Sequence, residues 1–279
     1  MKKPKVLYIL ISIFCVFAII AGIYAQFIDG NSNENTVQTG SDANIVQEKT
    51  QQEISNDFNA LFTNTLNLGG FDTTGIAKLD NTKEIVYSAY DVERNTENYE
   101  LNLHIPVINI NSELSNTFNR STLTTFINKA NEIIEKNDSS MPTLYSVDYA
   151  AFINDNVLSV VIKSTLKEGD SSQRIMVQTY NYNLSTNTEV PIIDLITMKQ
   201  LNRDEVNNKI MQVVSAAAQE DQTLQDMGYN QVYIRDLTNE MYIVENAGAY
   251  FLGANRDLYI VYAYGNAEFT SKMDIIYFE

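Results

Sequence analysis

One unbroken apolar segment stands near the start of the chain. Residues 6–28 contain no charged side chain, whereas three lysines precede them and Asp29 is the first charge after them. A run of 23 residues suffices to cross a hydrocarbon core of about 30 Å as a helix. The run is apolar on every side rather than on one face, which is typical of a helix surrounded by lipid. We therefore predict a transmembrane helix from Val6 to Ile28.

The charges that flank this helix predict its orientation. The positive-inside rule keeps Met1–Lys5 in the cytoplasm and the rest of the chain outside. A cleaved signal peptide is the alternative, because Ala25 is small enough for a cleavage point. Signal-peptide cores run about 7–15 residues, however, and bulky Ile23 stands where a small residue is needed. Cys15 suggests a lipoprotein, but Phe14 precedes it and it lies within the span, so we interpret it as an apolar helix residue.

A polar segment follows the span. Residues 29–52 contain no aromatic and few apolar side chains, a composition that cannot bury enough apolar surface to fold. We expect a disordered stalk there and a folded domain over residues 53–279, which begins with a short helix near Ile54–Phe62. This domain is either one unit or two modules, near residues 80–185 and 186–279.

Alternating apolar and polar positions predict many strands in the folded part. From Tyr99 to Val107 the odd positions are apolar and most even ones are polar, which is the period of a half-buried strand. The same alternation runs from Tyr145 to Ile153, and Asn154-Asp155-Asn156 then predicts a hairpin turn. The predicted strands are 85–90, 99–107, 145–153, 157–166, 174–184, 241–244, 250–252, 258–264 and 273–278.

Two longer amphipathic helices interrupt these strands. Asn111 or Ser112 can cap the first, and Glu113 in its first turn suits the helix dipole. Its apolar stripe extends over residues 123–134, and the second helix is predicted over residues 203–223. Hairpin strands with two main amphipathic helices predict an α+β fold, with helices on one face of antiparallel sheet.

Charge and cysteine content narrow the possible functions. The chain has 19 basic and 35 acidic residues, and three of the basic ones are the lysines before the span. So acidic an exterior repels nucleic acid and other polyanions and attracts cationic partners, although solubility alone is the simpler explanation. Cys15 is the only cysteine, so the exported part can form neither a disulfide nor a cysteine metal cluster.

Few residues are candidates for catalysis or metal binding. His104 is the only histidine, so a Ser-His-Asp or Cys-His catalytic device, or a histidine metal site, would depend on it. Its strand places it beside Glu100 and Asn102 on a polar face without a nucleophile motif, which favours an ordinary surface histidine. Paired carboxylates could cleave glycosides, but no pair stands out among 35 acids. Glu168-Gly169-Asp170 fits a cation-binding loop or, more simply, a solvated hairpin turn.

Tyrosines two positions apart form the last candidate feature. Tyr180 with Tyr182, and Tyr262 with Tyr264, place aromatic rings on one face of a strand. Such stripes are more often core or sheet surface than a platform for a ligand. The sequence therefore assigns no catalytic, cofactor-binding or metal-binding residue, and no cofactor is expected.

Two stretches carry a family resemblance. The first is LNLHIPVININSELSNTFN (101–119), a strand that ends in Ile-Pro-Val-Ile before an Asn-rich helix start. The second runs from VLSVVIKSTLKEGDSSQRIMVQTYNYNLSTNTEVPIIDLI (157–196) through a helix to DLYIVYAYGNAEFTSKMDIIYF (257–278). Together, over about residues 80–279, they resemble the paired extracytoplasmic modules of lysozyme-sensing anti-sigma factors. Related modules precede peptidoglycan deacetylase domains.

The resemblance implies an α+β ectodomain that recognises a protein or a wall component outside the membrane. In the sensor branch the partner is lysozyme, a basic protein that would suit the acidic exterior. Typical members carry Gly-Gly-Ala-His in the central hairpin, where this chain has Lys167–Ser172. Sensors also place a sigma-binding segment before the span, where only Met1–Lys5 stands, and no deacetylase domain precedes Glu279. Sigma-factor inhibition and deacetylation are therefore not expected, and no residue role is carried over.

The sequence thus favours a non-catalytic binding or sensing module of the bacterial cell envelope, anchored in the cell membrane by one helix. Its expected ligand is an extracytoplasmic protein such as lysozyme or a cell-wall component. An envelope hydrolase that uses paired carboxylates is one alternative. A structural subunit of a membrane complex is another, since small residues such as Ala18 and Gly22 lie four positions apart in the span.

Overall fold

The computed structural model describes residues 48–136, 141–230, 232–264, 269 and 271–279. The predicted span Val6–Ile28 lies outside these residues, as does most of the predicted stalk. Among the described helices, none combines the length and the apolar character that a membrane crossing requires. Lys49–Glu279 forms one compact unit, to which the following description applies.

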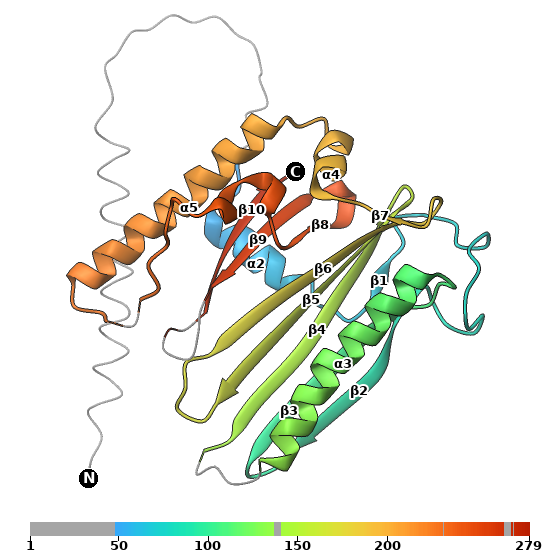
Figure 1. Ribbon diagram of the computed structural model, residues 1–279, viewed down its shortest axis with the longest axis horizontal. Helices are drawn as coiled ribbons and strands as arrows, with labels where there is room; N and C mark the ends of the chain where they lie inside the picture. Colours follow the sequence, from blue (N-terminus) through green and yellow to red (C-terminus); the bar gives the residue numbers. More distant parts are fainter. Residues whose placement is uncertain (1–47, 137–140, 231, 265–268, 270) are drawn as a thin grey trace, which may run out of the picture. The chain divides into compact units, whose positions relative to one another are not determined.

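Four α-helices and ten strands make up the described part of the chain (Figure 1). The helices are α2 (Gln51–Ala60), α3 (Glu113–Glu135), α4 (Ile192–Met198) and α5 (Arg203–Asp226). The strands are β1 (Leu66–Asn67), β2 (Val86–Asn95), β3 (Tyr99–Ile108), β4 (Thr143–Asn154), β5 (Val157–Glu168), β6 (Arg174–Asn183), β7 (Thr188–Glu189), β8 (Tyr250–Leu252), β9 (Leu258–Tyr264) and β10 (Lys272–Phe278). The predicted α+β class is confirmed.

Side-chain caps stand at the start of three of the four described α-helices. The Thr50 side chain accepts from the backbone N–H of Glu53, whose carboxylate in turn accepts from Thr50, so α2 starts with a capping box. Ser112 is the cap of α3, one of the two residues predicted for that role. Asn202 caps α5 by accepting from the N–H of Glu205. Each of these bonds satisfies a backbone donor that the first helical turn leaves free.

The larger sheet has the strand order β2-β3-β4-β5-β6-β7, and β1 pairs with β4 outside this path. The β2–β3, β4–β5 and β5–β6 pairs are antiparallel, as the hairpin patterns predict. β3 and β4 are instead parallel, which corrects the expectation of a purely antiparallel sheet. The physical reason is the long helix between them, because parallel neighbours need a crossover and α3 provides it.

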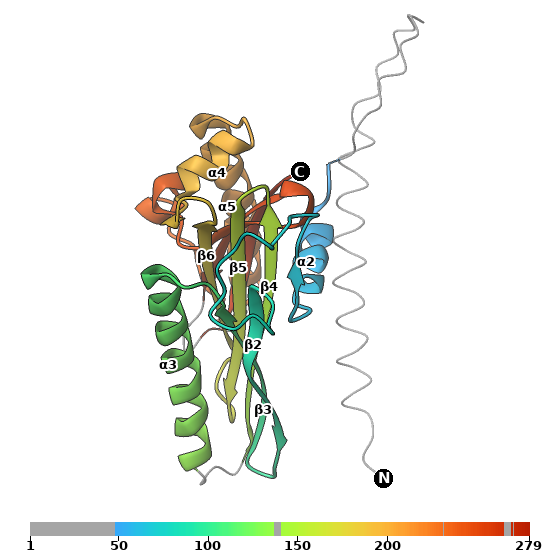
Figure 2. The ribbon, with the colours of Figure 1, turned by 90° about the vertical axis from the view of Figure 1, so that its right-hand side faces the viewer.

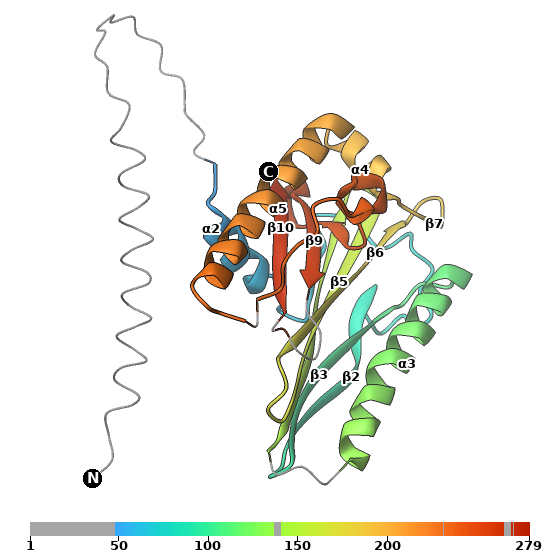
Figure 3. The ribbon, with the colours of Figure 1, turned by 60° about the vertical axis from the view of Figure 1, so that its left-hand side comes forward.

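Four layers bury three clusters of core residues. α3 packs on one face of the larger sheet, and the smaller sheet β10-β9-β8 packs on the opposite face (Figures 2 and 3). The outer side of the smaller sheet is covered by α4 and α5. α2 adds Ile54 and Phe58 to the cluster between the two sheets. Because α5 covers the second sheet rather than the first, the expectation that both main helices share one sheet is wrong.

The predicted strand 241–244 is also wrong. The segment forms two 3₁₀ turns, Glu240–Tyr242 and Val244–Asn246. Tyr242 and Val244 are buried and Ile243 is exposed, so the burial does alternate as in a strand. The backbone bonds are local, however, since the N–H of Tyr242 donates to Asn239. The Asn239 side chain caps the first turn, which favours this local bonding over a strand ladder.

Candidate functional site

The larger sheet divides where β3 and β4 separate. These strands pair only over Tyr99–Leu103 and Thr143–Val147, and beyond that point β1 takes the place beside β4. A pocket of about 320 Å³ lies at this division, which we name the fork pocket. Its lining comes from the loops before β1 and β2, from β2 itself and from β4: Asn64, Thr65, Thr82, Lys83, Glu84, Val86, Tyr87, Ser88, Asp91 and Tyr149.

A β-bulge shapes the β2 side of the fork pocket. The pairing of β2 with β3 shifts register between Ser88 and Tyr90. Such an extra residue bends a strand and redirects its side chains. Beside the bulge, Ser88 Oγ donates to Asp91 Oδ1 at 2.5 Å, and His104 Nδ1 lies 2.9 Å from the same oxygen. One carboxylate oxygen therefore gathers a hydroxyl and an imidazole at the rim of the pocket.

This arrangement differs from that of a Ser-His-Asp catalytic triad. In a catalytic triad the histidine stands between the hydroxyl and the carboxylate, so that it can take the hydroxyl proton. Here Asp91 stands between Ser88 and His104, and the imidazole contacts the carboxylate instead of the hydroxyl. The geometry is that of a polar surface network able to hydrogen-bond a ligand.

Two carboxylates influence a buried phenol in the fork pocket. Burial, together with the charges of Asp91 and Glu84, raises the pKa of Tyr149 to about 12, against a hydrogen bond from the Ser88 backbone. The phenol is therefore protonated at neutral pH. Asn64 closes the other side, since its side chain donates to Asp148 and accepts from the Tyr149 N–H. The pocket thus presents mainly oxygen acceptors, with Lys83 as the only basic side chain in its lining.

Below the fork pocket lies one sheet surface that no other described element covers. The side chains of β2, β3 and β4 that point away from α3 form it, and the strand register places them on one face. We name this surface the open face; its residues are Asp91, Glu93, Asn95, Glu100, Asn102, His104, Leu144, Ser146 and Asp148. The smaller sheet packs toward the other end of the larger sheet (Figure 3), where it contacts Ala150 and Phe152 of β4.

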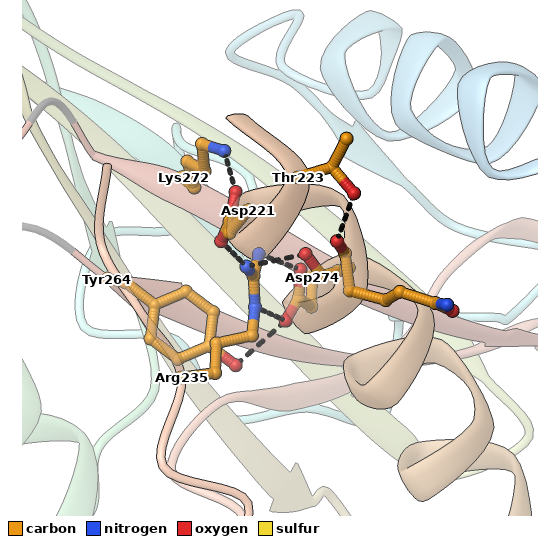
Figure 4. Close-up of polar contacts among 8 residues, drawn as sticks. Asp221, Thr223, Arg235, Tyr264, Lys272 and Asp274 are labelled. Carbon is orange, nitrogen blue, oxygen red and sulfur yellow. Dashed lines mark hydrogen bonds and ion pairs between the residues drawn. The ribbon is translucent and has the colours of Figure 1, made fainter. Parts of the chain in front are cut away.

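A second polar cluster is buried between α5 and the smaller sheet (Figure 4). The Arg235 guanidinium donates to both carboxylate oxygens of Asp274, at 2.6 Å each, and to Asp221. Tyr264 Oη donates to Asp274 at 2.9 Å, and Lys272 donates to Asp221.

The charges of this cluster are neutralised within it. Burial alone would lower the pKa of Arg235, but its bonds to Asp274 and the nearby acidic charges outweigh burial and raise the pKa. With every member bonded to another and the guanidinium only 3% exposed, the cluster is a structural tie.

The structure places the remaining predicted candidates in ordinary roles. Glu168-Gly169-Asp170 is a hairpin turn, with Gly169 at φ +53°, and the Glu168 carboxylate binds Lys129 and Arg174. Tyr182 and Tyr262 are buried in the core, as expected if these tyrosine stripes pack inside the domain rather than form a ligand platform. Cys15 lies outside the described residues. No group of three or more His, Cys, Asp or Glu side chains that could hold a metal ion occurs within the described part of the chain.

Sequence reasoning missed the partners of His104. It placed the histidine beside Glu100 and Asn102 along its own strand, whereas the bonded carboxylate, Asp91, comes from β2. The turn-forming residues 95–98 could have revealed this contact, because a hairpin at that turn places Asp91 opposite His104.

Comparisons with known proteins add little to this picture. The sequence matches no protein-family model and no curated protein. Two solved structures of the DUF3298 family are similar in part. One, from Pseudomonas aeruginosa, is 11% identical, with a TM-score of 0.35 over 66% of this chain and 83% of its own. The other, from Bacteroides fragilis, is 12% identical, with a TM-score of 0.32 over 63% and 79%. At these scores no property of either protein is carried to this chain.

Proposed function

We propose that this protein is a non-catalytic binding module on the outer face of a bacterial cell membrane, anchored by the predicted helix Val6–Ile28. Its ligand is an extracytoplasmic protein or a component of the envelope. The observation that carries the proposal is the open face, a broad, polar, acidic sheet surface beside a pocket. The other sheet faces of the domain pack against helices or against the second sheet. A charged surface of this kind suits a partner of complementary charge.

The polar chemistry supports binding rather than turnover. The one histidine of the chain contacts a carboxylate and lacks the bridging position that a hydroxyl nucleophile needs. The buried acids Asp221 and Asp274 are bonded to cations, so neither is placed to act on a glycoside. The hydrolase alternative needs two accessible carboxylates in one deep site, and Glu84 with Asp91 in the fork pocket is the pair to test for it.

Binding by the compact domain tests this proposal. A fragment of residues 48–279, which contains all three core clusters, is titrated with lysozyme and separately with soluble cell-wall fragments. Each titration is run at low salt and at about 150 mM salt, where exposed charges farther apart than about 8 Å are screened. We expect saturable binding of one ligand that persists at the higher salt, with the ligand recovered intact.

Two results would contradict the proposal. Binding that disappears at the higher salt would reflect only an acidic surface near a basic protein. Recovery of cleaved wall fragments would instead support the hydrolase, and a Glu84→Gln/Asp91→Asn variant of the fork pocket would then be tested for loss of cleavage.

A further inference from the structure

The open face is a sheet surface that no other described element covers. Along β4, the side chains that point away from α3 fall from 41% exposed at Leu144 to 2% at Ala150 and 6% at Phe152. The buried end is where the smaller sheet packs. The exposed end extends across β3 to β2, which is the outermost strand of the larger sheet. A partner can therefore approach this surface either perpendicular to the sheet or from the side of its edge strand, β2.

The formal charges of the open face are of one sign. Asp91, Glu93 and Glu100 are exposed, and no lysine or arginine stands among the residues of this surface. Lys163 and Lys167 on β5 border it, and Lys163 is held by a bond to the last turn of α2. A surface with this pattern attracts cationic groups and repels nucleic acid and anionic lipid.

The fork pocket adds an anchoring position at one end of the open face. Glu84 and Asp91 both line it, around the protonated phenol of Tyr149. Carboxylates grouped in this way can accept the several N–H donors of an ammonium or guanidinium group. Lys83 already places its Nζ 5.5 Å from the centroid of the Tyr87 ring, so the pocket rim accommodates an ammonium.

We propose that the open face is the docking surface for a basic protein segment, one lysine or arginine of which enters the fork pocket between Glu84 and Asp91. This inference rests on the proposed binding function and adds the location and the chemistry of the partner. The acidic strip orients the segment along β2 and β3, while the pocket holds a single cationic side chain. Lys83 lines the same pocket, and its positive charge repels that side chain.

Charge reversal on the open face tests the location. Lysozyme serves as the cationic probe, at about 150 mM salt, for the 48–279 fragment and its Glu93→Lys/Glu100→Lys variant. The matched control is Glu135→Lys/Glu220→Lys, which makes the same change in net charge on α3 and α5, away from the open face. We expect binding about tenfold weaker for the open-face variant and a change below about twofold for the control.

Two pocket variants test the chemistry of the occupant. Lys83→Gln removes a positive charge that repels a cationic occupant, so lysozyme should bind more tightly, while Glu84→Gln should weaken binding. An anionic occupant would give the opposite result for both substitutions, which would overturn the proposal. All four residues changed on the open face and in the pocket are exposed, and circular dichroism with thermal unfolding checks that each variant folds.

The outcomes separate this inference from the proposed function. If the wild-type fragment binds lysozyme and both double variants weaken binding equally, the open face is not the docking surface, although the binding function stands. If the wild-type fragment binds no probe of either kind, the proposed function itself fails and the inference falls with it.

Discussion

Arg235 and Asp274 form a two-point ion pair inside the domain, with guanidinium nitrogens 2.6 Å from each carboxylate oxygen. The planar guanidinium matches the spacing of the two oxygens, which a lysine could not do. Arg235 belongs to the loop after α5 and Asp274 to β10, so the pair ties this loop to the smaller sheet. Asp221 extends the tie to α5 itself.

Breaking this pair should destabilise the domain strongly. Arg235→Ala leaves Asp221 and Asp274 buried without their main counter-charge, at an expected cost of about 3–5 kcal/mol in the free energy of unfolding. Arg203→Ala is the matched control, because it removes an exposed pair with Glu245 and should cost less than about 1 kcal/mol. Urea unfolding of the 48–279 fragment measures both. Similar losses for the two variants would show that the buried cluster is not a structural tie.

A close backbone contact beside the fork gives a second prediction. Gly69 follows β1 with φ +54°, and a Cβ there would lie 2.6 Å from the carbonyl oxygen of Ile153 on β4. Gly69→Ala therefore forces an unfavourable backbone conformation and a clash, and should cost about 1–3 kcal/mol. Gly75→Ala meets no atom within 4 Å and should leave stability unchanged or slightly higher. Thermal unfolding of both variants distinguishes strain from a general loss of flexibility.

Alkaline pH gives a third prediction. The pKa of Tyr149 is raised from 10 to about 12, so between these values the phenol ionises in the unfolded chain but stays protonated in the folded one. The stability that it contributes is complete below pH 10 and is lost as the pH rises toward 12. The loss should be about 3 kcal/mol at most for this residue.

Tyr149→Phe provides the control for this titration. Urea unfolding at several values between pH 8 and about 11.5 should show a shallower decline for the variant than for the wild type. Other buried tyrosines whose pKa is raised, such as Tyr145, leave a residual slope in both proteins. Parallel declines would mean that Tyr149 does not ionise differently in the folded and unfolded states.

Local patterns were enough to predict most elements, but not their pairing. Period-two alternation located the strand from Tyr99 and the strand from Tyr145, because each buries one face. It could not show that these two strands pair in parallel, or that the two residues of β1 insert beside β4, since so short a strand has no pattern. Sheet pairing depends on contacts between distant segments, which no local window contains.

The polar sites differ in how far the sequence could reveal them. Asp91 and His104 are joined by one hairpin, so turn chemistry could have fixed their register. Arg235 meets Asp274 39 positions away, beyond β8 and β9, in a contact that only the folded chain defines. The orientation of the domain outside the membrane and the anchor Val6–Ile28 stay predictions from sequence.

Amide hydrogen exchange of the lysozyme complex tests the central claim most directly, because it reports both binding and its location. The 48–279 fragment is compared alone and with lysozyme at about 150 mM salt. The account predicts slower exchange in residues 82–104, which include the fork pocket and the open face of β2 and β3, and no change in α5. Protection confined to α5 or α3, or no protection anywhere, would contradict it.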